Sequence, residues 1–217
     1  MRHVFVETNW VVDWAAPAHH RNPAAVALLE RAQRGELQLH MPAICLTEAR
    51  PPISLRFQPK EAKPLRQFLK WAAKYMPELS DDIAAGRRVL DAFENTIKSG
   101  LREVGDRLDS LRETRGLEIF ALDDAMLERA VELTALDMQL KPFDQAILAA
   151  ILVRGDRLTA DDASELAFCV LDGDLQPWTK DSKAKQPLTG LYDHARIWVY
   201  GDFDLRVPVP YQGWGID

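Results

Sequence analysis

The chain has 217 residues, of which 47% are hydrophobic, and carries a net charge of −6. This composition excludes a disordered chain, and no apolar run reaches the roughly 18 residues that predict a membrane-spanning helix. Glu7 interrupts the first apolar stretch, so the N-terminus does not read as a secretory signal. Cys45 and Cys169 both stand in apolar surroundings. We therefore expect two buried free thiols and a cytoplasmic protein, because disulfides are rare in that reducing compartment.

Charge is distributed unevenly along the chain. Residues 49–115 contain 14 Lys and Arg against 10 Asp and Glu, whereas the remainder contains 13 against 23. One interpretation is a solvated helical face. The other is an arm that contacts phosphates beside an acidic site. For that arm the RNA-binding candidates are Arg87, Arg88 and Arg102.

The N-terminal part alternates strand and helix signals. RHVFV is rich in β-branched and aromatic residues, which favour strands. Asn22-Pro23 has the order of a helix N-cap and first-turn proline, and Gly35 stands where a helix-ending glycine belongs. The elements expected here are a strand at 2–6, a helix at 23–34, a strand at 37–41 and a helix that begins at Pro42 and runs through AICLTEA.

A strongly helical pattern then occupies residues 52–115. The prolines at 51–52 and 59 predict breaks in the chain. Apolar residues recur at helical spacing over 65–76 and again over 83–111, so we expect a hairpin of two helices inserted into the main fold. Three glycines weaken the second helix and predict a kink or break there: Gly86, Gly100 and Gly105.

The C-terminal part continues the alternation. The elements expected are a strand in LEIFAL (117–122), a helix at 124–140, a helix that begins at Pro142, a buried strand in ELAFCVL (165–171) and a strand in RIWVY (196–200). Strands that alternate with helices indicate an α/β fold around a parallel sheet.

Several acidic residues fall near the carboxyl ends of these strands, where a parallel sheet binds its ligands. Glu7 ends the first strand, Asp172 and Asp174 follow the ELAFCVL strand, Asp144 lies in a first helical turn, and Glu48 lies near a helix end. Carboxylates brought together repel one another unless cations offset their charge. Hard divalent ions prefer oxygen ligands, so Mg²⁺ or Mn²⁺ is the expected cofactor.

Structural roles compete with this interpretation. Asp144 in a first helical turn can simply complement the helix dipole, and the two aspartates around Gly173 can be turn residues. Glu7 is harder to explain by packing, because it follows an apolar strand directly. Thr8 and Asn9 can cap the next turn and can also orient the Glu7 carboxylate.

Four segments in order resemble the motifs of PIN-like nucleases. VFVETN resembles the opening motif, LTEA the second, LKPFDQAILAAIL the third and VLDGDL the fourth. The resemblance implies a single domain over 1–217 with a three-layer α/β/α fold, a central parallel sheet and the helical-hairpin insertion at 52–115. It departs from the family at Glu7, where the family usually has Asp, and in an insertion longer than that of the small toxin-type members.

The resemblance also implies a catalytic site and a substrate. Glu7, Asp144 and Asp172 would hold one or two Mg²⁺ or Mn²⁺ ions, with Glu48 and Asp174 assisting and Thr8 and Asn9 supporting. The ions would activate a water for in-line attack on phosphorus and offset the charge of the leaving 3′-oxygen. The implied activity is an endoribonuclease that hydrolyses single-stranded RNA. A homodimer and an antitoxin-like protein partner stay open, and no membrane partner is expected.

Two other functions remain as rivals. A catalytically weak PIN-like adaptor that binds RNA or protein is favoured by the Glu7 departure. A metal-dependent phosphatase needs an Asp nucleophile, commonly in a DxD pattern after the first strand, whereas this chain has ETN there. A dehydrogenase or NTPase lacks support, because no glycine-rich phosphate loop follows the first strand.

Overall fold

The computed structural model of the chain describes residues 1–57, 60, 62–136, 138–160, 165–181 and 183–206. A five-stranded sheet, parallel throughout, lies at its centre, in the strand order β3-β2-β1-β4-β5. The strands are β1 (Arg2–Val6), β2 (Leu37–Pro42), β3 (Leu117–Phe120), β4 (Glu165–Cys169) and β5 (Ile197–Tyr200). The predicted α/β fold around a parallel sheet is therefore confirmed.

Helices connect the strands. They are α1 (Thr8–Ala15), α2 (Pro23–Gln33), α3 (Ile44–Arg56), α4 (Ala62–Tyr75), α5 (Ser80–Ser110), α6 (Asp124–Thr134), α7 (Pro142–Ala160) and α8 (Leu188–His194), with the 3₁₀ turns η1 (Ala18–His20), η2 (Pro77–Leu79) and η3 (Leu111–Glu113). The chain runs outward from β1 to β3 and then returns past β1 to β4 and β5. Right-handed crossovers place the helices of these two halves on opposite faces of the sheet, which is compatible with three α/β/α layers.

The strand order creates a topological switch point at one edge of the sheet. β1 is the middle strand and lies between β2 and β4, so that Phe5 pairs with His40 on one side and Phe168 on the other. The connections leave the carboxyl ends of β1 and β4 in opposite directions. A topological switch point of this kind is where open α/β sheets bind ligands.

Helix α3 differs from its prediction. It begins at Ile44 instead of Pro42 and continues through Pro51 and Pro52, so the break expected at these prolines is wrong. Proline removes a helical hydrogen bond. Ala49 and Ile53, on either side of the pair, are both buried in the main core, and their packing outweighs that loss.

Other helices also differ from their predictions. α5 is one continuous helix of 31 residues in spite of its three glycines, because Leu90 packs against α4 while Val104 and Leu108 pack into the main core. α6 ends at Thr134, earlier than expected. The helices α1 and α8 were not foreseen as separate elements.

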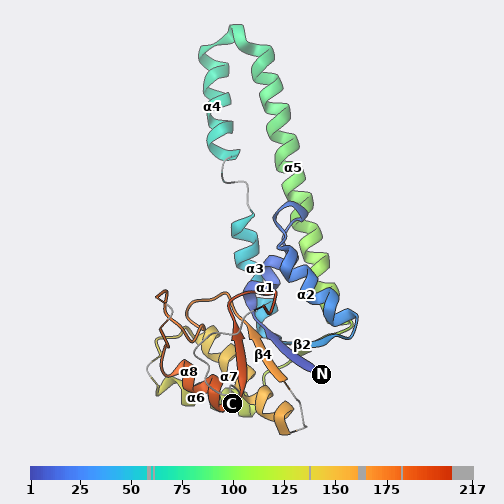
Figure 1. Cartoon of the computed structure of the whole chain (residues 1–217). Helices are drawn as coiled ribbons and strands as arrows, with labels where there is room; N and C mark the ends of the chain where they lie inside the picture. Colours follow the sequence, from blue (N-terminus) through green and yellow to red (C-terminus); the bar gives the residue numbers. More distant parts are fainter. Residues whose placement is uncertain (58–59, 61, 137, 161–164, 182, 207–217) are drawn as a thin grey trace.

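The hairpin of α4 and α5 projects away from the sheet, as Figure 1 shows. At its base, Arg107 donates from Nη2 to the carbonyl oxygens of Ala15 and Ala16, at 2.9 and 3.1 Å. These bonds join α5 to the end of α1. The outer half has a small hydrophobic core of its own, which consists of Ala62, Leu69, Ala72, Ile83 and Leu90.

Among the described residues, no helix is long and apolar enough to cross a membrane. Cys45 and Cys169 are both buried and free, as expected from their apolar surroundings.

Candidate functional site

Glu7 follows β1 directly, at the edge of the sheet where the carboxyl ends of β1 and β4 lie side by side. It caps the N-terminus of α1, and its carboxylate accepts hydrogen bonds from the backbone N–H of Asn9 at 2.7 Å and of Leu171 at 3.3 Å. The residue is only 2% exposed. Burial raises the pKa of Glu7 from 4.5 to about 7, and the charge of Asp172 adds to the increase. The two N–H groups fix the direction of the carboxylate. Thr8 and Asn9 were both expected to orient the Glu7 carboxylate. Of the two, Asn9 does so, through its backbone N–H.

Thr8 orients a different carboxylate. Its hydroxyl donates a hydrogen bond to Oε2 of Glu48, which reaches it from α3. Cys45, one turn earlier on α3, is fully buried, and its thiol pKa is raised by burial and by the charges of Glu7 and Glu48. The second motif and the first motif therefore meet where α1 packs on α3.

Asp144 enters the site from α7. This helix leads into β4, so it runs opposite to the strands and its first turn lies at their carboxyl edge. Asp144 is 5% exposed, and its Oδ2 is buried without a hydrogen-bond partner in the described part of the chain. Burial raises the pKa of Asp144 from 3.8 to about 6, with further increases from Asp172 and Glu48. A residue that served only the helix dipole would be stabilised as the anion instead.

Asp172 and Asp174 follow β4 in a turn. Oδ1 of Asp172 accepts from the backbone N–H of Asp174 at 2.8 Å, so part of its role is that of a turn residue. Lys185 donates from Nζ to the carbonyl oxygens of Gly173 and Asp174, at 3.1 and 3.0 Å. Lys141 lies 4.0 Å from the Asp174 carboxylate. Two lysines thus border the turn.

The five predicted carboxylates occupy one neighbourhood. The charges of Asp172, Glu48 and Asp174 each raise the pKa of Asp144, and that of Asp172 also raises the pKa of Glu7. Across the described ranges, no three His, Cys, Asp or Glu side chains are spaced as ligands of one metal ion. The donor set nevertheless fits a hard cation, because it consists of carboxylate oxygens and includes the unpartnered Oδ2 of Asp144.

A polar network on the sheet had no role in the sequence interpretation. His3 Nδ1 lies 2.8 Å from His40 Nε2, and His40 Nδ1 lies 2.7 Å from Glu118, which Arg154 of α7 also contacts at 2.6 and 2.8 Å. Burial lowers the pKa of His40 to about 4. The network joins β1, β2 and β3 to α7. Glu118 pairs with His40 in the strand register, and this pairing could not be foreseen before the strand order was known.

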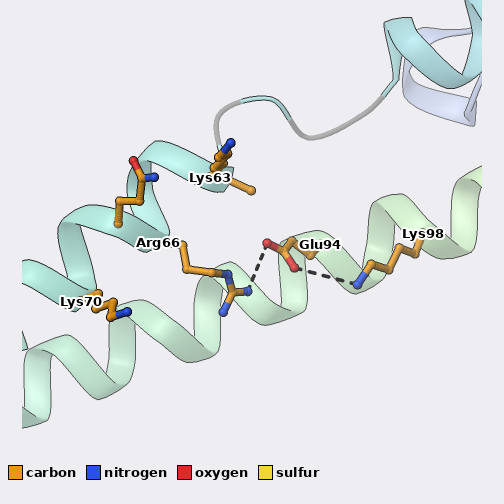
Figure 2. Close-up of a pocket in the computed structure, with 7 residues that line it drawn as sticks. Lys63, Arg66, Lys70, Glu94 and Lys98 are labelled. Atoms are coloured by element: carbon orange, nitrogen blue, oxygen red, sulfur yellow. Dashed lines mark ion pairs between the residues drawn. The ribbon is translucent and has the colours of Figure 1, made fainter.

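The hairpin carries a basic cleft of about 470 Å³ between α4 and α5. Figure 2 shows Lys63, Arg66 and Lys70 on one helix and Glu94 and Lys98 on the other. Arg66 bonds to Glu94 at 3.1 Å and to Asp91 at 2.8 Å, whereas Lys98 lies 3.9 Å from Glu94. The cleft thus keeps excess positive charge. The predicted Arg87, Arg88 and Arg102 lie exposed on α5 outside its lining.

Comparison of the chain with protein-family models, with curated proteins and with solved structures finds no match. The class established by the structure is an α/β protein with a parallel five-stranded sheet and a projecting helical hairpin.

Proposed function

We propose that the chain is a PIN-like, metal-dependent endoribonuclease that hydrolyses phosphodiester bonds in single-stranded RNA. The buried, unpartnered Asp144 carboxylate, whose pKa the charges of Asp172, Glu48 and Asp174 raise, carries the proposal. Burying like charges together costs stability. Strongly perturbed carboxyl groups at the carboxyl edge of a parallel sheet therefore favour a functional site over a purely structural one.

Each residue has a part in this proposal. Glu7, Asp144 and Asp172 would hold Mg²⁺ or Mn²⁺, with Glu48 and Asp174 assisting. Bound ions would supply an activated water and would offset charge on the leaving 3′-oxygen. The N–H groups of Asn9 and Leu171 fix the direction of the Glu7 carboxylate, and the Thr8 hydroxyl donates to that of Glu48. Glu7 is one methylene longer than the Asp usual in PIN-like proteins. The hydrogen bond that caps α1 holds its carboxylate in place.

A cleavage assay tests the proposal. The full chain would be incubated with a mixture of unstructured RNAs and with Mn²⁺ or Mg²⁺, with and without chelator. We expect cleavage that depends on the metal and that yields 5′-phosphate and 3′-hydroxyl ends, because water attacks phosphorus. Ends with a 2′,3′-cyclic phosphate would show attack by the RNA 2′-hydroxyl and would exclude this mechanism. An inert chain that still binds RNA would support the adaptor alternative.

Metal affinity should rise with pH. The pKa values of Glu7 and Asp144 are about 7 and about 6, and protons compete with cations for these carboxylates. Titration calorimetry with Mn²⁺ should show affinity that increases between about pH 5.5 and pH 8, with proton release on binding. If the affinity stayed constant over this pH range, neither carboxylate would be a metal ligand.

Without metal, the same pKa increases make the folded chain less stable as pH rises. A carboxyl group whose pKa is raised on folding binds more protons when folded, so its contribution to stability is present at low pH and lost as pH rises through the folded value. The metal-free chain should therefore become easier to melt as pH rises through about 6 and 7. Added Mn²⁺ should reverse the loss at the upper end.

RNA binding by the hairpin can be tested through its salt dependence. Lys63 and Lys70 line the cleft, and the described structure gives neither an ion pair. Removal of one phosphate-binding cation should reduce the slope of log affinity against log salt by about 0.7 for single strands. We expect Lys63→Gln with Lys70→Gln to flatten the slope, measured by fluorescence polarisation. A triple variant that replaces Arg87, Arg88 and Arg102 tests the sequence prediction in parallel. If neither variant changed the slope, the basic residues of the hairpin would form only a solvated surface.

A further inference from the structure

The outer hairpin exposes large apolar side chains that its own core does not cover. Leu65, Val89 and Phe93 line a groove between α4 and α5, on which no described element packs. Phe68, Trp71 and Tyr75 continue from Leu65 along α4 at spacings of three and four residues, which places them along one side of the helix. All six are at least 45% exposed. We call this set the apolar hairpin face.

The face is as large as the largest apolar patches that monomeric soluble proteins leave open. A fully covered aromatic side chain buries about 150–250 Å². Four half-exposed aromatics with Leu65 and Val89 therefore present on the order of 600 Å² of apolar surface. The largest patch on a typical monomer is about 300–600 Å², and such patches often mark interaction sites.

Few buried side chains hold the two helices of the hairpin together. Its core contains five residues, of which Ala62 and Ala72 are small. Two helices bury only one stripe each, and a pair of hairpins solves this problem by forming a four-helix bundle with a shared core. The hairpin extends away from the sheet (Figure 1). A partner on this face therefore has access to it without displacing any part of the main fold.

We propose that the apolar hairpin face is a dimer interface, which pairs the hairpin with that of a second copy of this chain. A stable interface buries about 800 Å² on each partner. Interfaces between identical chains are about 65% apolar, so roughly 500 Å² of apolar surface is needed on each copy. The six side chains supply this amount. A twofold pairing needs no second surface, because the same patch serves both copies.

The ring geometry distinguishes a protein partner from stacked RNA bases. Phe68 and Trp71 have ring centroids 6.1 Å apart with planes at 28°, and Trp71 and Tyr75 lie 5.5 Å apart. Each ring is therefore partly covered by a neighbouring ring, which leaves less of its face for bases. The cations that line the basic cleft, Lys63, Arg66 and Lys70, also lie on a different side of α4 from the three rings.

Analytical ultracentrifugation of the full chain tests the interface. We expect the wild type to have twice the 24.6 kDa mass of one chain at about 1 µM and above, where standard-sized interfaces remain paired. Val89→Glu and Trp71→Glu should each halve this mass. Both side chains are exposed, so the substitutions leave the hairpin core untouched. Circular dichroism would check that the helices persist.

Val131→Glu is the matched control. Val131 lies on α6 and is 73% exposed, against 71% for Val89. It should leave the dimer intact. A monomeric wild type, or a dimer that persists in Trp71→Glu and Val89→Glu, overturns the proposal. If Trp71→Glu weakens binding of a single-stranded uridine oligomer without changing the mass, the face binds RNA instead. None of these readouts requires cleavage, so the outcome is independent of the proposed nuclease activity.

Discussion

Asp144→Asn should abolish metal-dependent RNA cleavage while the fold persists. The amide has nearly the same shape but lacks the charge that holds a cation. Mutation of groups that merely support metal ligands costs about 10–100-fold, so loss of a direct ligand should cost at least about 100-fold in rate. The metal-free variant should melt at the same temperature or higher, because the substitution removes a buried charge that Asp172 and Glu48 repel.

Asp124→Asn is the control for this variant. Asp124 also lies in the first turn of a helix, α6, but it is exposed. It should retain activity. If both variants cleave like the wild type, Asp144 has only a structural role. Glu7→Asp is the companion test, since it introduces the residue that PIN-like proteins usually have at the position that Glu7 resembles. We expect reduced or altered activity if Glu7 is a ligand. An inert wild type whose Asp variant gains cleavage would support the adaptor alternative.

Gly116→Ala should destabilise the chain more than other single-methyl additions. Gly116 has φ +82°, and an added Cβ would lie 2.5 Å from the carbonyl carbon of Ala32 and 3.0 Å from the Gln33 nitrogen. These are backbone atoms at the end of α2, and no rotamer change can move them. The chain returns from the hairpin at this point, where the Gly116 carbonyl oxygen accepts from the N–H of Leu39 at 2.9 Å. Left-handed strain and overpacking together should cost about 3 kcal/mol or more.

Gly35→Ala separates the two causes. Gly35 has nearly the same backbone angle, φ +78°, but nothing lies within 4 Å of its added Cβ. It should cost only the backbone term of about 1–2 kcal/mol. In a chain of this size each kcal/mol corresponds to about 2–4 °C in Tm. Thermal melting should therefore place Gly116→Ala clearly below Gly35→Ala. Equal Tm values would show that the main chain at Ala32 yields to the methyl group.

Local sequence signals predicted most of the elements. The strand at 2–6 matches β1, and the Asn22-Pro23 signal matches the start of α2, where the Asn22 side chain accepts from the Ala24 N–H at 3.0 Å. The hairpin helices also followed their apolar spacing. The errors fell where tertiary contacts outweigh local preference. Pro51 and Pro52 lie inside α3, and three glycines lie inside an unbroken α5, because buried side chains on both sides hold these helices.

The sequence indicated candidate residues for the site but not their surroundings. Strand-end position and motif order indicated Glu7, Asp144 and Asp172 as candidates. The sequence did not show that Thr8 would bond to Glu48, or that Leu171 would donate to Glu7 across 164 positions of the chain. The pKa increases at Glu7 and Asp144 arise mainly from burial. Burial of a polar residue depends on its neighbours in space, which composition and spacing do not describe.

Periodicity, caps and the alternation of strands with helices determined by themselves that this chain is an α/β protein with a helical hairpin, because these signals depend on residues a few positions apart. Only the tertiary structure decided the order β3-β2-β1-β4-β5, the switch point between β1 and β4, and the two contrasting surfaces of the hairpin. Strand order depends on contacts between distant segments. The covered or open state of an apolar residue such as Val89 depends on what packs beside it. Its pattern in the sequence is the same in either case.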